Sequence, residues 1–323
     1  PVIMNVVYNI NLGIVNPYIN KIIYAYNKCI RRIAQMKDYI IFTDSACDME
    51  LSTLKKWNVK CIDLTLKFEN EEKIWSNNEI EPKTFYQKMR DGGIAKTSAV
   101  NSEKFKQGFE EEIKKGNDIL YLAFSSGLST TCNSGAFACK ALSEVYPDSK
   151  LITVDSLAAS AGFGLLLYLA VQKKEEGATI EELEKYIKET VPHICHWFTV
   201  DDLVYLKRGG RVSPAAAFIG GMLGIKPVLH VDDEGHLVPV TKVRGRKASI
   251  KALADKYGEL AIDKTTGPIF ICQGDCQEDA QLLADIIKND YGRDIDITVY
   301  TGPVIGAHSG PGTLALFFLG KNK

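Results

Sequence analysis

The sequence predicts an α/β protein with a mostly parallel, Rossmann-like sheet covered by helices on both faces, followed by a second, smaller α+β domain. From residue 38 onward, apolar strand-like runs alternate with helical segments of about 10–18 residues, which is the pattern of a parallel sheet. Several of these strands are apolar throughout, as expected for strands that are buried on both faces. After about residue 195 the strands become shorter and the connections richer in glycine, which indicates a second domain.

The chain length also favours more than one domain. The chain has 323 residues, and a single hydrophobic core stops growing near about 250–300 residues. We predict an N-terminal extension at 1–36, a Rossmann-like domain at 37–195 and a second domain at 196–323. Within the extension, INKIIYAYNKCIRRIAQM (19–36) has the charges of a basic amphipathic helix. A weakly ordered appendage is the alternative interpretation.

The first domain is predicted to contain four strands and several helices. The predicted strands are 39–44, 59–68, 118–125 and 150–156. The predicted helices are a short one after Asp48, then 81–93, 101–116, 128–146, 158–175 and one after Thr179. The glycines that close segment 81–93 are typical of a helix C-terminus, and Glu181 and Glu182 suit a helix first turn. The run 158–171 is apolar all round, which predicts a buried helix.

The second domain is predicted to begin with short strands and a hairpin. The hairpin turn is DDEGH at 232–236. A helix follows at 247–260, a strand at 267–274, a helix at 276–290 and a strand at 294–302. In the closing segment, His308 lies in AHSGPG, whose glycines and proline predict a loop.

The composition excludes several classes of function. The net charge is −1, and the longest basic cluster, KVRGRK at 242–247, is too short to form a nucleic-acid-binding surface. No run reaches the ~18–20 apolar residues of a transmembrane helix. The eight cysteines are scattered, which favours free thiols in a reducing cytoplasm. His193, Cys195 and His196 have no second cluster at ligand spacing, so we expect no metal and no cofactor.

Hydroxyl and carboxyl side chains follow three of the predicted strands. They lie at 43–45, 125–126 and 155–156, and a further loop carries Thr97 and Ser98. Ligands of open α/β sheets bind beyond the carboxyl ends of the strands, where helix N-termini favour anions. The alternative is simple capping of turns, which we expect of Asp44 and Asp155 in particular.

A carboxylate suits these loops better than a polyphosphate. The sequence has neither GxxxxGK[ST] nor GxGxxG at a strand–helix turn. A serine hydrolase or acyl transferase that uses Ser126 with His308 as its base is an alternative, although AFSSG lacks the GxSxG pattern. A pure interaction or regulatory domain is a third hypothesis.

Two segments combine small residues with large apolar ones, at 158–171 and 214–225. Small side chains either leave room for an apolar tunnel or allow helices to pack closely, and the residues alone leave both alternatives open. Burying ~14 methylenes in such a tunnel would contribute roughly 11 kcal/mol before the cost of ordering the ligand.

The chain from about 38 to 320 resembles the DegV family of fatty-acid-binding proteins. The matching segments include FTDSACDM, KTSAV, SSGLSTT, FTVDDLVYLKRGGRVS, GGMLGIKPVL, KVRGRKA and GPVIGAHSGPGTLALFF. The resemblance implies a long-chain fatty acid held between two domains. It also implies a cytoplasmic carrier without enzymatic activity of its own, which presents the acid to a separate fatty acid kinase for phospholipid synthesis. Peripheral contact with a membrane for lipid exchange is an expectation of the same kind.

The resemblance also implies which residues bind the ligand. Thr97, Ser126 and His308 are expected at the carboxylate, with Ser125 as the alternative to Ser126. Arg211 and Arg244 are expected on the headgroup side or at the kinase-docking surface, and structural ion pairs are the alternative for both. Close to the expected headgroup site, the chain departs from the family pattern, because Thr130 replaces a glycine and Cys132 replaces an aromatic residue.

Overall fold

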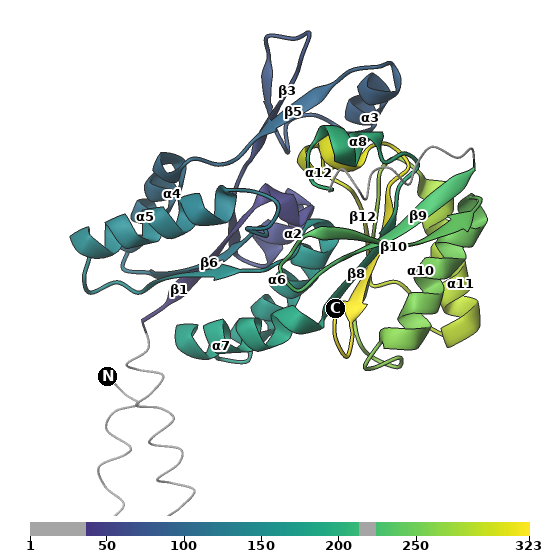
Figure 1. Cartoon of the computed structure of the whole chain (residues 1–323). Helices are drawn as coiled ribbons and strands as arrows, with labels where there is room; N and C mark the ends of the chain where they lie inside the picture. Colours follow the sequence, from purple (N-terminus) through teal and green to yellow (C-terminus); the bar gives the residue numbers. More distant parts are fainter. Residues whose placement is uncertain (1–36, 213–223) are drawn as a thin grey trace, which may run out of the picture. The chain divides into compact units, whose positions relative to one another are not determined.

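The computed structural model describes residues 37–212 and 224–323. The predicted N-terminal extension (1–36) and most of the small-residue segment 214–225 lie outside the described residues. Residues 39–323 form one compact unit. The elements of this unit are shown in Figure 1.

The strands and helices are as follows. The strands are β1 (Tyr39–Asp44), β2 (Val59–Ile62), β3 (Thr65–Phe68), β4 (Ile74–Ser76), β5 (Ala95–Ser98), β6 (Asp118–Ala123), β7 (Leu151–Asp155), β8 (Ile194–Thr199), β9 (Ile225–Val231), β10 (Leu237–Arg244), β11 (Ile269–Gln273), β12 (Ile297–Tyr300) and β13 (Leu314–Leu319). The helices are η1 (Ser45–Cys47), α2 (Leu51–Lys56), α3 (Pro82–Arg90), α4 (Ser102–Lys114), α5 (Thr131–Val145), α6 (Ser160–Glu175), α7 (Ile180–Thr190), η2 (Val191–His193), α8 (Val204–Arg208), α10 (Arg246–Leu260), α11 (Gln277–Tyr291) and α12 (Pro303–Ser309).

The first sheet is parallel throughout, with the strand order β2-β1-β6-β7. Every residue of β1 and β6 is buried, which explains why both strands are mainly apolar, with Thr43, Asp44 and Asp118 as the exceptions. Helices α4 and α5 pack against strands of this sheet, as does α7. The predicted parallel α/β architecture is confirmed.

The second sheet has six strands in the order β10-β9-β8-β13-β11-β12. Only β11 and β12 pair in parallel, and helices α10 and α11 pack against this sheet. Strands β9 and β10 form the predicted hairpin around 232–236. The sheet-rich second part of the predicted fold is therefore confirmed. The domain boundary at 195/196 stays a prediction, and β8 of this sheet already begins at Ile194.

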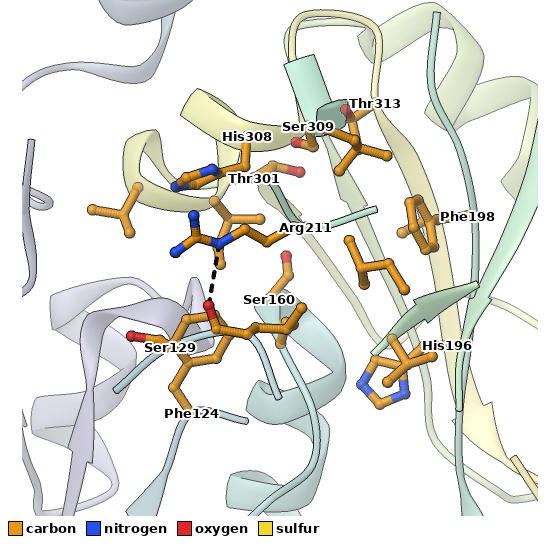
Figure 2. A pocket seen from close by; sticks show the side chains of 18 of the residues that line it. Phe124, Ser129, Ser160, His196, Phe198, Arg211, Thr301, His308, Ser309 and Thr313 are labelled. Carbon is orange, nitrogen blue, oxygen red and sulfur yellow. Dashed lines mark hydrogen bonds between the residues drawn. The ribbon is translucent and has the colours of Figure 1, made fainter. Parts of the chain in front are cut away.

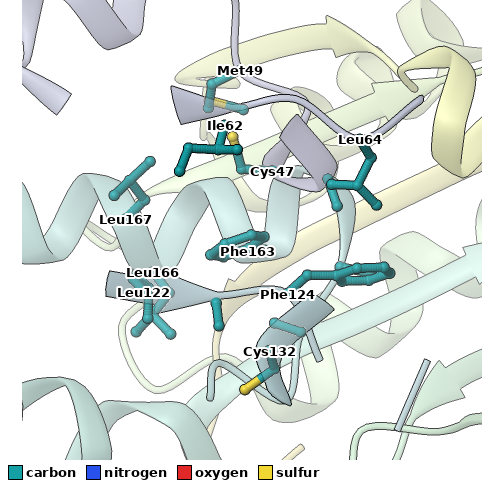
Figure 3. Close-up of a cluster of buried hydrophobic side chains, with 14 of the residues drawn as sticks. Cys47, Met49, Ile62, Leu64, Leu122, Phe124, Cys132, Phe163, Leu166 and Leu167 are labelled. Atoms are coloured by element: carbon teal, nitrogen blue, oxygen red, sulfur yellow. The ribbon is translucent and has the colours of Figure 1, made fainter. Parts of the chain in front are cut away.

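Helix α6 connects the two sheets. It packs against β8, β11 and β13 of the second sheet. Its residues Phe163, Leu166 and Leu167 belong to the same buried cluster as Leu122 of β6, which Figure 3 shows. Because α6 has apolar neighbours on several sides, it carries no polar face along its first three turns, as predicted for a buried helix.

Two predicted features of the first domain are wrong. The single strand predicted at 59–68 is two strands, β2 in the parallel sheet and β3 in a separate antiparallel sheet of order β4-β3-β5. The strand is interrupted at Leu64. The Leu64 N–H donates to the Ser45 hydroxyl oxygen at 3.0 Å instead of pairing with a neighbouring strand. The loop predicted around Thr97 is strand β5, which pairs with β3.

The loop predicted around His308 is also different. Residues Pro303–Ser309 form helix α12, with His308 in its last turn. Pro303 occupies the first turn, where its missing N–H costs nothing, and Gly310 follows the end with a φ of 86°. The helix therefore places His308 on a fixed backbone.

Candidate functional site

The carboxyl ends of β1, β6 and β7 lie at one edge of the parallel sheet, because the three strands are neighbours. At this edge the Asp44 carboxylate accepts hydrogen bonds from the Tyr121 hydroxyl and the Phe124 N–H, at 2.7 and 2.9 Å, and it also caps η1. Burial raises the pKa of Asp44 to about 6. Asp155 accepts from the N–H groups of Ser126 and Leu157. Both acids are therefore turn-capping carboxylates, as predicted.

A cavity of about 430 Å³ lies between this edge and the second sheet. Its wall is mainly apolar, and Figure 2 shows part of its lining. The apolar lining includes Phe124, Leu128, Phe198, Val231, Leu237 and Phe317. The volume lies within the ~300–1,000 Å³ that is usual for small-molecule sites. The exposed lining residues Ser126 and Thr130 mark the open end of the cavity.

Four of the predicted site residues line the cavity together: Thr97, Ser126, Arg211 and His308. We refer to them as the polar cluster. Thr97 comes from β5, Ser126 from the turn after β6, Arg211 from the segment after α8, and His308 from α12. Four segments that are far apart in sequence thus bring hydroxyl, imidazole and guanidinium groups to one cavity, with no carboxylate among them.

Thr97 and His308 are in direct contact, with 2.7 Å between Thr97 Oγ1 and His308 Nε2. Burial and, to a smaller extent, the positive charge of Arg211 lower the pKa of His308 to about 4, so the imidazole is neutral near pH 7. The ring approaches Gly209 so closely that a Cβ at that position would lie 2.2 Å from His308 Nδ1. Gly209 therefore makes room for the imidazole.

Arg211 is held by backbone carbonyls. Its Nε donates to the Leu128 carbonyl oxygen at 3.2 Å, and Nη1 donates to the Gly209 carbonyl oxygen. Among residues 37–212 and 224–323, no carboxylate lies within ion-pair distance of this guanidinium. Partial burial lowers the pKa of Arg211, because the charge is removed from water without an opposite charge beside it. Arg211 is therefore suited to receive an anion.

The two adjacent serines have different surroundings. The Ser125 side chain is fully buried, and its hydroxyl donates to the Gly235 carbonyl oxygen at the tip of the β9–β10 hairpin, at 2.9 Å. Ser125 is not part of the cavity lining, whereas Ser126 is exposed and lines it. The structure thus brings Ser126 and not Ser125 to the polar cluster.

Arg244 does not reach the cavity. It is exposed near the end of β10, where it pairs through its backbone with Ile225 of β9. The nearby Arg246 is instead held internally, with its Nε 2.9 Å from an Asp279 carboxylate oxygen. Of the two predicted arginines, only Arg211 lies at the candidate site.

Sequence reasoning missed a second group of polar lining residues at the buried part of the cavity. Ser160, Cys272 and Thr301 line it, and the hydroxyls of Ser160 and Thr301 both contact Cys272 Sγ, at 3.1 and 3.2 Å. The Ser160 hydroxyl also lies 2.5 Å from Oδ2 of Asp48, and burial raises the pKa of this carboxyl to about 7. The sequence feature that could have indicated this group is Ser160, an isolated polar residue at the start of an apolar helix.

The geometry offers little to a serine hydrolase. Within the described residues, no hydrogen bond joins Ser126 to His308, and the contact of Nε2 is with Thr97 instead. The neighbouring charge is that of Arg211, which lowers the pKa of the imidazole and makes it a weaker base. A triad needs a carboxylate at this position to orient and stabilise the base.

The cysteines and the other possible metal ligands of the described residues have mostly protein partners or lie apart from one another. The seven cysteines there form no disulfide. His193 and Cys195 each contact a backbone carbonyl near the C-terminus, at Gly320 and Asn322. In residues 37–212 and 224–323, the only group of three or more possible metal ligands within reach of one another is Asp232, Glu234 and His236, at an exposed hairpin tip. No helix in these ranges is both long enough and apolar enough to cross a membrane.

Comparison with known proteins identifies the family. The family model of the uncharacterised DegV proteins matches residues 39–321, which is most of the chain. This chain belongs to the DegV family. A DegV domain-containing protein of Clostridium perfringens is 45% identical over 289 residues, which cover 89% of this chain and 99% of the relative.

Solved structures of similar proteins have the same fold. A Thermotoga maritima protein described as having a fatty acid binding function is 30% identical, with a TM-score of 0.76 over 88% of this chain and 99% of the other. A fatty-acid-binding DegV protein of Thermus thermophilus is 26% identical, with a TM-score of 0.79 over 88% and 100%. A stearic-acid-binding protein of Eubacterium ventriosum is 25% identical, with a TM-score of 0.79 over 88% and 98%.

Proposed function

We propose that this DegV protein binds a long-chain fatty acid, with the carboxylate at the polar cluster and the hydrocarbon chain in the apolar cavity. The observation that carries the proposal is the combination of an arginine that has no carboxylate partner among the described residues and uncharged hydroxyl donors, at the open end of a mainly apolar cavity of about 430 Å³. Three solved relatives that bind fatty acids support the same ligand class.

Each member of the polar cluster has a role in this proposal. Arg211 supplies the charge, and the hydroxyls of Thr97 and Ser126 donate to the carboxylate oxygens. His308 stays neutral and fixes the orientation of the Thr97 hydroxyl through their 2.7 Å contact. The acyl chain then lies against Phe198 and the second sheet, where each buried methylene contributes about 0.8 kcal/mol.

The direct test is to extract the purified protein with organic solvent and to identify the released lipids by mass spectrometry. We expect stoichiometric long-chain fatty acid in the extract. After the lipid is removed, the protein should rebind octadecanoic acid. An extract free of fatty acid, together with no rebinding, would rule out the proposal.

The two serines provide a matched pair of variants. Ser126→Ala should weaken octadecanoic acid binding by about tenfold or more, because a hydrogen bond to a charged group is lost, and it should leave thermal stability nearly unchanged at this exposed position. Ser125→Ala should lower thermal stability and leave octadecanoic acid binding nearly unchanged. It leaves the Gly235 carbonyl without its donor, at a cost of about 1–3 kcal/mol of stability. Titration with octadecanoic acid and thermal unfolding of both variants distinguish the two roles.

The proposal extends to a carrier role. We infer that the protein itself performs no chemistry on the acid and presents the carboxylate, at the open end of the cavity, to a separate fatty acid kinase for phospholipid synthesis. A cytoplasmic location and transient membrane contact for lipid exchange belong to the same proposal. Arg244 is exposed outside the cavity, which suits a docking role.

The docking role can be tested separately from binding. In a reaction with ATP and a fatty acid kinase, Arg244→Glu should reduce acyl phosphate formation by about tenfold or more, while octadecanoic acid binding stays unchanged. The exposed Lys242→Glu on the same strand provides a control for the added negative charge. Equal losses for the two variants would contradict a specific role of Arg244.

A further inference from the structure

Ser129 is a further hydroxyl-bearing residue in the lining of the cavity. It is half-buried and lies three residues after Ser126, in the turn between β6 and α5. The carbonyl oxygen of the preceding residue, Leu128, accepts a hydrogen bond from Arg211. Figure 2 shows Ser129 on the Arg211 side of the cavity, away from His196. Ser129 therefore lies at the end of the cavity that holds the polar cluster.

The Ser129 hydroxyl is paired with that of Thr131. Their oxygens, Ser129 Oγ and Thr131 Oγ1, are 2.9 Å apart, and the Thr131 N–H also donates to Ser129 Oγ at 3.2 Å. Thr131 is the first residue of α5 and is fully buried. Its Oγ1 accepts in turn from the Val100 N–H at 3.4 Å. Thr131 thus connects the turn with the segment that follows Thr97 on β5.

One of the two hydroxyls must donate to the other, and burial decides which. If Ser129 were the donor, Thr131 Oγ1 would accept from both Ser129 and Val100, and its own proton would have no acceptor among residues 37–212 and 224–323. Native proteins rarely leave a buried donor unpaired, because its loss of hydration is then not compensated. The hydrogen-bond network therefore assigns Thr131 as the donor and Ser129 as the acceptor.

This assignment leaves Ser129 with only its proton to offer to a ligand. A hydroxyl oxygen has two acceptor lone pairs, and those of Ser129 Oγ accept from the N–H and the O–H of Thr131. Within the described part of the chain the Ser129 proton has no acceptor, and unlike Thr131 the residue is only half-buried. Ser129 is therefore suited to donate to a group in the cavity.

A carboxylate is the headgroup that such a donor fits. An ionised carboxylate has about four lone-pair sites and no proton, so it can only accept. In the proposed function three groups donate to it, from Thr97, Ser126 and Arg211. The Ser129 hydroxyl brings the number of donor groups to four and adds no charge.

We propose that Ser129 is a fourth binding residue for the fatty acid carboxylate, and that the buried Thr131 is a positioning residue which commits the Ser129 hydroxyl to donation. This inference rests on the proposed function, because it needs a carboxylate at the polar cluster. Thr131 does not touch the acid and acts through Ser129.

The donor role is tested on the delipidated full-length protein, titrated with octadecanoic acid and with 1-octadecanol, which has the same chain without the carboxylate. Ser129→Ala should weaken binding of the acid by about tenfold or more and binding of the alcohol by clearly less, because hydrogen bonds to charged groups are the stronger ones. Ser129→Thr keeps a hydroxyl and should retain most of the affinity. A general disturbance of the turn would weaken both ligands alike.

The positioning role is tested with Thr131→Val, which keeps a branched side chain of similar size and removes the hydroxyl. It should weaken binding of octadecanoic acid by about threefold or more. The double variant Ser129→Ala/Thr131→Val should bind the acid as weakly as Ser129→Ala alone, since Thr131 acts through Ser129. Thermal unfolding verifies that the variants fold. The double variant needs only the acid, and the two ligands test Ser129→Ala without any change at Thr131.

The possible results separate this inference from the proposed function. If Ser129→Ala leaves the affinity for the acid unchanged, or lowers the affinities for acid and alcohol equally, the inference is wrong although fatty acid binding stands. Additive losses in the double variant would contradict the positioning role of Thr131. If the wild type does not bind octadecanoic acid, the proposed function itself fails.

Discussion

Replacing Ala315 with phenylalanine is expected to lower the affinity for octadecanoic acid by roughly a hundredfold and to shift the preference toward shorter acids. Ala315 lies on β13, between Phe198 of β8 and Cys272 of β11 in the second sheet, and all three residues line the cavity. A phenyl ring at this position occupies space that the acyl chain needs. Displacing about four methylenes at about 0.8 kcal/mol each costs about 3 kcal/mol, or roughly a hundredfold in affinity.

The same substitution should not destabilise the protein. A larger side chain usually strains a packed core by about 1–3 kcal/mol, but here it enters a cavity. A graded series of Ala315→Val, Ala315→Leu and Ala315→Phe should therefore lose affinity in order of side-chain volume while the midpoint of thermal unfolding stays nearly constant. As a control, Ala254→Phe places the same ring in the closely packed cluster under α10 and should lower that midpoint.

Binding and chain-length competition decide the outcome. Octadecanoic acid that binds a folded Ala315→Phe protein as tightly as it binds the wild type would mean that the acyl chain does not occupy this cavity. If short and long acids lose the same affinity, the substitution disturbs the binding of the carboxylate and not that of the hydrocarbon chain.

The sequence predicted where the site lies better than which side chains form it. Parallel neighbouring strands end at the same edge, so hydroxyls and acids after 39–44, 118–125 and 150–156 were expected to meet, and they do. The choice between Ser125 and Ser126 could not be made in this way. It depends on Gly235, a residue more than a hundred positions away, whose carbonyl takes the Ser125 hydroxyl.

Tertiary contacts also explain the wrongly predicted elements. The four residues of β5 have little strand character of their own, and they are extended because they pair with β3, which carries the buried Leu66 and Phe68. Helix α12 was not predicted because it is short and contains Gly306, and glycine is unfavourable in a helix. That glycine leaves room for Tyr86, since a Cβ there would lie 2.5 Å from the tyrosine hydroxyl oxygen. Distant packing partners of this kind are not visible in a single sequence.

The small residues of 158–171 turned out to serve both of the alternatives that the sequence left open. Ala159 and Ser160 line the cavity. Gly162 and Gly164 serve close packing, because a Cβ on either would meet His196 or Met49 within about 2.6 Å. His196 itself was noticed only as part of a metal-like cluster. The alternation of β8 would have placed it on the same face as Phe198.

The second large effect concerns Asp48. We expect the wild type to lose folding stability as the pH rises from about 5 to about 8, and we expect Asp48→Asn to lose much less. Burial, with a smaller contribution from the nearby negative charge of Asp44, raises the pKa of Asp48 from its usual value of 3.8 to about 7. The folded state therefore holds a proton that the unfolded chain releases near pH 4. The stability due to this proton is complete below about pH 4 and is lost as the pH rises through about 7.

The size of the effect follows from the difference between the two pKa values. Between about pH 5 and pH 8 the wild type should lose about 2–3 kcal/mol through Asp48, at about 1.4 kcal/mol per pH unit below the folded-state pKa. Asparagine keeps an acceptor for the Ser160 hydroxyl and carries no charge at either pH. The difference between the unfolding free energies at the two pH values should thus be smaller in the variant than in the wild type.

Urea unfolding of both proteins at the two pH values measures this difference directly. The partly exposed Asp263 provides the control: hydrogen bonds from the Thr265 and Thr266 hydroxyls lower its pKa, so its carboxyl is ionised in the folded and unfolded states throughout this range. Asp263→Asn should leave the pH dependence between about pH 5 and pH 8 as it is in the wild type. Parallel pH profiles for Asp48→Asn and the wild type would show that Asp48 is already ionised in the folded protein at about pH 5. The Ser160 hydroxyl would then donate to a buried carboxylate, and the wall of the cavity would carry a negative charge.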